Sequence, residues 1–154
     1  MEGSQILFQF EYLTGAIRIF RRVTFEVVAV NTGEAAATVR VLGFRGGGLG
    51  LFRTDQFFDS DVDSVGSSPT TGVVPPGSIW KANPTIQADE FGLYWFRIRT
   101  TSQTLVPTLF VQEFVQAGES ATLATYTPGD FTRIRRRGPD ASPPPDEDLP
   151  TTDE

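Results

Sequence analysis

The sequence predicts an all-β protein: a single β-sandwich of jelly-roll type, with about eight or nine strands, followed by a disordered C-terminal tail. Three observations support this prediction. Apolar and polar residues alternate with a period of two through most of the chain, as they do in strands with one buried face. Turn-forming residues interrupt the alternation at short intervals. No segment has the 3.6-residue apolar period of a helix.

The N-terminal residues 1–14 are predicted to form a strand or an arm. Alternate residues of this segment are apolar and share one face: Ile6, Phe8, Phe10 and Tyr12. Thr14-Gly15 offers a turn before the body of the sandwich, which is predicted over residues 15–137. An apolar strand can complete the sheet edge of another subunit, so we expect Ile6, Phe8 and Phe10 to belong to an assembly interface.

Two long alternating runs, residues 17–31 and 36–44, begin the body of the sandwich. Their inward faces are predicted to carry the apolar members of the alternation: Val23, Phe25, Val27, Ala29, Val39 and Val41. Glycines dominate residues 46–50 and break the pattern. Because neither a helix nor a phosphate-loop lysine follows them, they predict a loop or a bulge rather than a nucleotide site.

Residues 54–72 are polar and acidic and predict a solvated loop anchored by Phe57 and Phe58. Residues 73–77, VVPPG, predict a polyproline-like turn. Further strands are expected at 78–83, 91–101, 103–114 and 120–126, with a turn at 127–130.

Residues 91–99, FGLYWFRIR, have two different faces when the residues are sorted by parity. The face predicted to point inward carries Tyr94, Phe96 and Ile98. The opposite face carries Leu93, Trp95, Arg97 and Arg99. A large indole beside two guanidinium groups suits a half-exposed contact surface.

Two predictions concern individual residues in the last part of the sandwich body. Pro107 indicates an edge strand or a bulge, because proline cannot donate to a strand ladder. In the closing segment FTRIRRR, Phe131 and Ile134 are predicted to reach the core.

Residues 138–154 are predicted to form a disordered, acidic, proline-rich tail. The chain has a net charge of −6, and its last six acidic residues lie between Asp140 and Glu154 with no basic residue among them. Removing these six from the 19 acidic residues leaves 13, which equals the 13 basic residues, so residues 1–139 are formally neutral. A neutral domain lacks the electrostatic footprint of a nucleic-acid-binding protein. We therefore expect no nucleic-acid partner.

The chain has no cysteine and no histidine, which removes thiolate nucleophiles, histidine bases and nearly all zinc, copper and haem sites. An enzyme would then need a carboxylate pair, a Ser–Lys pair or a tyrosine. Three glutamates lie within predicted strands, but nothing in the sequence pairs them: Glu11, Glu26 and Glu113. Ser78 and Lys81 have the SxxK spacing, but that motif requires a helix and a strand is predicted here. We expect no enzymatic activity and no cofactor.

Asp59, Asp61 and Asp63 alternate as in the first half of an EF-hand loop. Ser64 and Thr70 occupy the positions where that loop requires glycine and glutamate. A solvated loop is therefore favoured over a calcium site, and no bound metal is expected.

The basic run Arg133–Arg137 directly precedes the acidic tail, within about a Debye length. We expect this run to dock on an acidic partner, for instance the Asp59–Asp63 loop of a neighbouring subunit, rather than on nucleic acid.

The segments GLYWFRIRTTSQTLVPTLFVQEF, TPGDFTRI and VTFEVVAVNTGEAAATVRVLGF resemble a pattern found in small, largely uncharacterised all-β proteins of spore-forming Firmicutes. The resemblance covers residues 20–135. More distantly, the chain is similar to the jelly-roll subunits of endospore appendages, which assemble by lending N-terminal segments to their neighbours. It departs from them by lacking the N-terminal cysteines that cross-link those fibres. The resemblance implies self-assembly and provides no catalytic residues.

These observations predict a non-enzymatic structural protein, a self-assembling subunit of an extracellular or spore-surface filament or layer. Its partner would be itself, with Trp95, Arg97 and Arg99 in the interface, since these residue types are enriched in interfaces. Two alternatives are a viral (phage) decoration or fibre protein, and a carbohydrate-binding module in which Trp80 and Trp95 form a stacking platform.

The opening MEGSQILFQFEYL lacks the features of an ordinary signal peptide, and no stretch reaches the ~20 apolar residues of a membrane span. We therefore expect no membrane insertion. The sequence is compatible with a mature form, with export by a route other than general secretion, or with a protein that stays inside the cell. The predicted function favours a cell- or spore-surface location, reached by an unknown route.

Overall fold

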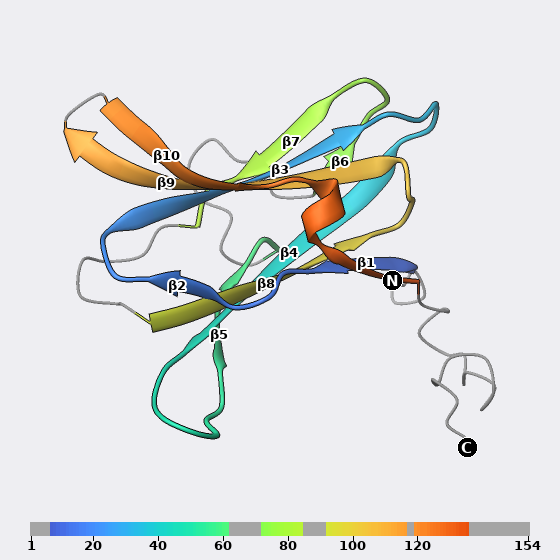
Figure 1. The fold of residues 1–154 in the computed structure, drawn as a ribbon. Helices are drawn as coiled ribbons and strands as arrows, with labels where there is room; N and C mark the ends of the chain where they lie inside the picture. Colours follow the sequence, from blue (N-terminus) through green and yellow to red (C-terminus); the bar gives the residue numbers. More distant parts are fainter. Residues whose placement is uncertain (1–6, 62–71, 85–91, 117–118, 136–154) are drawn as a thin grey trace, which may run out of the picture.

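Two antiparallel β-sheets face each other in the computed structural model, which describes residues 7–61, 72–84, 92–116 and 119–135 (Figure 1). The seven-stranded sheet has the order β11-β1-β8-β4-β5, with β2 also on β8 and β6 also on β4. Its strands are β1 (Phe10–Leu13), β2 (Ile17–Ile19), β4 (Ala37–Gly46), β5 (Asp55–Asp59), β6 (Val73–Val74), β8 (Gly92–Thr100) and β11 (Thr132–Arg135). The four-stranded sheet has the order β10-β9-β3-β7 and consists of β3 (Val23–Asn31), β7 (Ile79–Ala82), β9 (Leu105–Gln116) and β10 (Glu119–Tyr126). The predicted all-β sandwich is confirmed.

The inner faces of the two sheets form one hydrophobic core, as the alternation of apolar residues predicts. The residues predicted to point inward on three strands are buried: Val23, Phe25, Val27, Ala29, Val39, Val41, Tyr94, Phe96 and Ile98. Phe25 of β3 joins the two sheets, because its ring centroid lies 4.8 Å from that of Phe96 and 5.5 Å from that of Tyr94 on β8. Such aromatic contacts stabilise a core beyond the area they bury.

The chain does not turn at Thr14-Gly15, contrary to the prediction. Strands β1 and β2 both pair with β8, and residues 14–16 lie opposite only two residues of β8. The Thr14 N–H donates to the Phe96 carbonyl at 3.1 Å, and the Phe96 N–H donates to Thr14 Oγ1 at 2.9 Å. The threonine hydroxyl thus replaces a backbone acceptor at a bulge. Residues 10–13 therefore belong to the sandwich itself and not to a separate arm.

Two segments predicted to be loops contain strands. Strand β5 lies within the acidic segment 54–72, where Phe58 is buried and Phe57 packs with its ring centroid 5.9 Å from that of Phe96. A register shift between Gly43 and Phe44 lets both neighbouring phenylalanines contact the core. Strand β6 lies in the predicted polyproline-like turn, and the run 17–31 divides into β2 and β3. The described residues therefore form eleven strands, more than the eight or nine predicted.

The two predictions for the last part of the body have different outcomes. Pro107 lies in β9 opposite Ala29 of β3, and the register with β10 ends at Leu109. Within the described residues Pro107 thus has a neighbouring strand on one side only, where its missing N–H is tolerated. Phe131 is buried as predicted, whereas Ile134 is exposed, because it lies opposite Glu11 on the outer face of the sheet.

Candidate functional site

The outer face of the seven-stranded sheet carries an aromatic pair on its two central strands. Phe44 of β4 lies directly opposite Trp95 of β8, and their rings stack with centroids 4.3 Å apart and planes inclined by 17°. The Trp95 indole N–H also donates to Thr54 Oγ1 at 3.3 Å. The stack and the hydrogen bond hold the indole in one orientation on a half-exposed surface.

Arg97 covers this aromatic pair. Its guanidinium carbon lies 5.5 Å from the Trp95 ring centroid and 5.9 Å from that of Phe44, within the range of cation–π attraction. Arg97 Nε is buried and makes no hydrogen bond to any residue that the structure describes, although it lies 3.6 Å from Glu11 Oε2. The Arg97 guanidinium therefore interacts with the faces of both rings and with the Glu11 carboxylate.

Glu11 of β1 is a buried carboxylate on the same face. Its side chain is 2% exposed, and Arg99 Nε donates to its Oε2 at 2.8 Å. The sheet register places Glu11 opposite Arg99, and Arg99 opposite Arg40 of β4. A buried carboxylate requires such a partner, because an isolated buried charge is costly.

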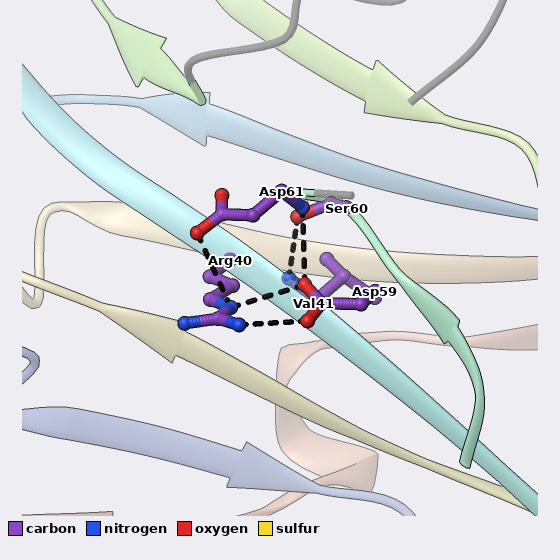
Figure 2. Close-up of polar contacts among 5 residues, drawn as sticks. All are labelled: Arg40, Val41, Asp59, Ser60 and Asp61. Atoms are coloured by element: carbon purple, nitrogen blue, oxygen red, sulfur yellow. Dashed lines mark hydrogen bonds and ion pairs between the residues drawn. The ribbon is translucent and has the colours of Figure 1, made fainter. Parts of the chain in front are cut away.

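A second arginine–carboxylate cluster joins β4 to the end of β5 (Figure 2). Arg40 donates from Nε to Asp59 Oδ1 at 3.0 Å and from Nη2 to Asp59 Oδ2 at 2.7 Å, and its Nε lies 3.3 Å from Asp61 Oδ2. Asp59 Oδ1 also accepts the Asp61 N–H at 3.0 Å. Ser60 contacts Val41 twice, since its Oγ accepts the Val41 N–H at 3.0 Å and its N–H donates to the Val41 carbonyl at 2.9 Å. This cluster fastens the acidic end of β5 to β4.

The cluster changes the protonation equilibria of both partners. Burial raises the pKa of Asp59, but the hydrogen bonds from Arg40 and the Asp61 N–H, with the charges of Arg40 and Arg99, lower it more. The net pKa of Asp59 is therefore below its ordinary value. The pKa of Arg40 is raised, chiefly by its hydrogen bond to Asp59.

Two members of the acidic triplet Asp59, Asp61 and Asp63, which was considered as a calcium site, pair with Arg40 instead. Asp59 uses both carboxylate oxygens on Arg40, and Asp61 lies against the same guanidinium group. Asp63 lies outside the described residues. Over residues 7–61, 72–84, 92–116 and 119–135, no three His, Cys, Asp or Glu side chains gather as metal ligands do. Asp59 and Asp61 are therefore paired with Arg40 of the same chain. The Arg133–Arg137 run of a neighbouring subunit could bind them only by displacing Arg40.

The residues predicted to form an assembly interface fall into two groups. Trp95, Arg97 and Arg99 lie together on the outer face, where the two arginine side chains are 30% and 28% exposed. Phe8 and Phe10 are half-buried, and Phe10 packs against the core; Ile6 lies outside the described residues. Strand β1 pairs with β8 on one side and β11 on the other. Lending residues 10–13 to another subunit would therefore break pairing on both sides.

The glutamates within strands do not form a catalytic pair. Glu11 lies on the seven-stranded sheet, while the register of β3 with β9 puts Glu26 and Glu113 on opposite faces of the other sheet. Glu26 is bound by Lys81 at 3.0 Å, and Glu113 by Arg21 at 3.0 Å. Each carboxylate is thus neutralised separately, which differs from the shared site of a glycosidase.

Strand β7 removes two further possibilities. Ser78 directly precedes β7 and Lys81 lies in it, so the two residues are not in a helix. The Lys81 ammonium group is ion-paired with Glu26. Trp80 is buried in the core, whereas Trp95 lies on the outer face of the other sheet. The two indoles cannot form a common stacking platform, because one faces inward and the other outward.

Comparisons with protein-family models, with curated proteins and with solved structures found no match. Among the described residues, no helix is long and apolar enough to cross a membrane. Neither Phe44 nor the Arg40–Asp59 pair was predicted from the sequence. Phe44 shares the parity of Arg40 within the run 36–44, so the alternation could have placed it on the outer face.

Proposed function

We propose that this protein is a non-enzymatic structural subunit, a β-sandwich of jelly-roll type that joins copies of itself into a filament or layer at an extracellular or spore surface. One observation carries the proposal: the two open edges of the seven-stranded sheet carry opposite charges. Strand β5 is the acidic edge and β11 is the basic edge. The spore-surface location rests on the sequence resemblance described above.

The two edges are accessible to a partner. Asp55 and Gln56 at the start of β5 are exposed, and so are all four residues of β11, which include Arg133 and Arg135. No strand of the described residues pairs with the outer side of either β5 or β11. Unpaired edges of this kind are templates for adding another strand.

The direction of the strands determines how two copies would join. Four successive antiparallel pairings separate β11 from β5, so these two strands run in the same direction. A copy translated along the sheet therefore brings β5 beside β11 of its neighbour in a parallel pairing.

The registers within one copy give the offset that pairing Asp55 with Arg133 would require. Arg133 is level with Ile98 of β8, whereas Asp55 is level with Tyr94, four residues away along the same strand. A slide of four residues, about 13 Å at 3.3 Å per residue, places Asp55 opposite Arg133. Because four is even, the inward and outward residues of the joined sheets stay on their own faces.

The charges favour this contact over its competitors. Two β11 edges repel each other through Arg133 and Arg135, and two β5 edges repel through the exposed Asp55, while unlike edges attract. A contact between two different surfaces of the same subunit does not close into a dimer and propagates as a filament when the rotation does not form a ring. The outer face with Trp95, Arg97 and Arg99 is then available for contacts between neighbouring rows, and its ordered side chains lose little entropy on binding.

A charge exchange tests the proposed joint. We expect Asp55→Arg and Arg133→Asp each to prevent assembly of the full chain, because each puts like charges at the joint. The double variant should restore assembly, as seen by sedimentation velocity and negative-stain microscopy. Glu34→Arg is the matched control, since Glu34 is exposed in the turn between β3 and β4. Wild-type protein that stays monomeric at every concentration, or single variants that assemble normally, would contradict the proposal.

A further inference from the structure

The hairpin between β4 and β5 exposes two leucines at its tip. Leu49 is 97% exposed and Leu51 is 102% exposed, more than any other large apolar residue that the structure describes. Gly48 and Gly50 have φ angles of 146° and 70°, which residues with side chains rarely adopt. The glycine run is thus a loop, as predicted, and both leucines extend from it into solvent, away from the described part of the sandwich.

A third exposed apolar residue lies at the same end of the sandwich but at the opposite edge of the sheet. Phe20, which follows β2, is 62% exposed, and the Arg21 guanidinium carbon lies 5.4 Å from its ring centroid. Strand β2 pairs with β8 on the side away from β4, the same side on which β1 and β11 lie. The leucine hairpin, in contrast, leads directly into the edge strand β5.

We infer that the leucine hairpin, residues 47–54, of one copy packs against β2 and Phe20 of the next copy. This inference rests on the proposed function and deepens it by naming the apolar part of the joint. The β4 end of the hairpin is level with Leu93 of β8, and β2 is level with residues 92–94 of the same strand. The four-residue slide that pairs Asp55 with Arg133 moves the hairpin of the next copy along the segment that contains the Thr14 bulge and β2.

The occupant is a second copy because the hairpin and the acidic edge are consecutive in the chain. A strand that pairs with the outer side of β5 and extends past Asp55 comes close to residues 47–54, because these residues directly precede β5. The two sides of the joint also match in character, since each combines an exposed charge with exposed apolar groups: Asp55 with the leucines on one edge, and Arg133 with Phe20 on the other.

Disulfide trapping tests the contact directly, because the chain has no cysteine of its own. Leu51→Cys protein carrying one tag is mixed with Phe20→Cys protein carrying another and oxidised. We expect the mixed disulfide dimer to form in clear excess over the mixed dimer of Leu51→Cys with Leu123→Cys. Leu123 is the matched control, since it is 45% exposed on β10 of the other sheet. Equal yields of the two mixed dimers would overturn the inference.

Assembly provides the second measurement. We expect the double variant Leu49→Ser/Leu51→Ser to raise the concentration needed for assembly about tenfold. Leu123→Ser should leave that concentration unchanged, and both variants should keep the wild-type melting temperature. A leucine variant that assembles like the wild type, while Asp55→Arg does not assemble, would remove the hairpin contact and leave the proposed function standing. Flotation of the wild type, but not of the leucine variant, with phosphatidylserine vesicles would assign the hairpin to a lipid surface and overturn the inference. Monomeric wild-type protein would contradict the proposed function as well.

Discussion

Arg40 and Asp59 form a bidentate ion pair that ties β4 to β5. Arg40 Nε lies 3.0 Å from Asp59 Oδ1, and Nη2 lies 2.7 Å from Oδ2. The Asp59 side chain is 8% exposed and that of Arg40 is 30% exposed, so the pair is shielded from solvent more than an ordinary surface pair. Paired planar groups of this geometry make strong, directional contacts.

Replacing Asp59 by asparagine should therefore destabilise the domain in a pH-dependent way. We expect Asp59→Asn to cost about 2 kcal/mol of unfolding free energy at pH 7, because a charged hydrogen bond is lost. The folded pKa of Asp59 lies below 3.8, its ordinary value, so this stabilisation is present above the unfolded pKa and disappears as the pH falls through the folded pKa. Urea titrations from neutral pH to below pH 3.8 should show the difference between wild type and variant shrinking on the acid side. A difference that stays constant would assign the cost to packing and not to charge.

The two faces of β8 should respond differently to truncation. Phe96 is fully buried with its ring centroid 4.8 Å from that of Phe25, so Phe96→Ala should cost about 3–5 kcal/mol and unfold much of the protein. Trp95→Ala removes a stack on the outer face and should cost about 1–2 kcal/mol while the circular dichroism stays native. Where Trp95 contributes to contacts between rows, that variant should also weaken lateral association. Denaturant titration of both variants measures the unfolding free energy that each one loses. A larger loss for Trp95→Ala than for Phe96→Ala would contradict the observed parity.

Gly43 should not accept a side chain. A Cβ at this position would lie 2.6 Å from Phe57 Cε1 and 3.0 Å from Phe96 Cε2, so at least one of these rings would have to shift. We expect Gly43→Ala to cost about 1–3 kcal/mol through overpacking, measured as a lower urea midpoint. Gly15→Ala is the matched control, because no atom lies within 4 Å of the added Cβ. Equal effects at both positions would show that loss of glycine flexibility, and not the close contact, determines stability.

The Thr14 hydroxyl should be essential for the bulge between β1 and β2. Thr14 Oγ1 accepts the buried Phe96 N–H at 2.9 Å, and valine has nearly the same shape without an acceptor. We expect Thr14→Val to cost about 1–3 kcal/mol, because the amide is left without its partner. Thr14→Ser keeps the hydroxyl and should retain most of the stability. Hydrogen exchange at the Phe96 amide should accelerate in the valine variant only, and an unchanged exchange rate would contradict the role of the hydroxyl.

The sequence by itself determined the all-β architecture and the burial of most strand residues. The alternation in residues 91–99 correctly separated Tyr94, Phe96 and Ile98 from Trp95, Arg97 and Arg99. It could do so because the two faces of a strand follow from local backbone geometry, which needs no knowledge of the neighbouring strands. The turn predicted at Thr14-Gly15 and the loop predicted around Phe57 were wrong, because at each position the chain continues along its neighbouring strand through a bulge that adds one residue and shifts the alternation.

Only the tertiary structure decided which side chains meet. Arg40 and Asp59 are 19 residues apart and Glu11 and Arg99 are 88 apart, and both pairs depend on which strands lie side by side and in which register. The opposite charges of β5 and β11 likewise became visible only once these strands were found at the two edges of one sheet. Strand order and register are set by the simultaneous burial of many inward faces across the sandwich, a long-range balance that the period of a single strand does not contain.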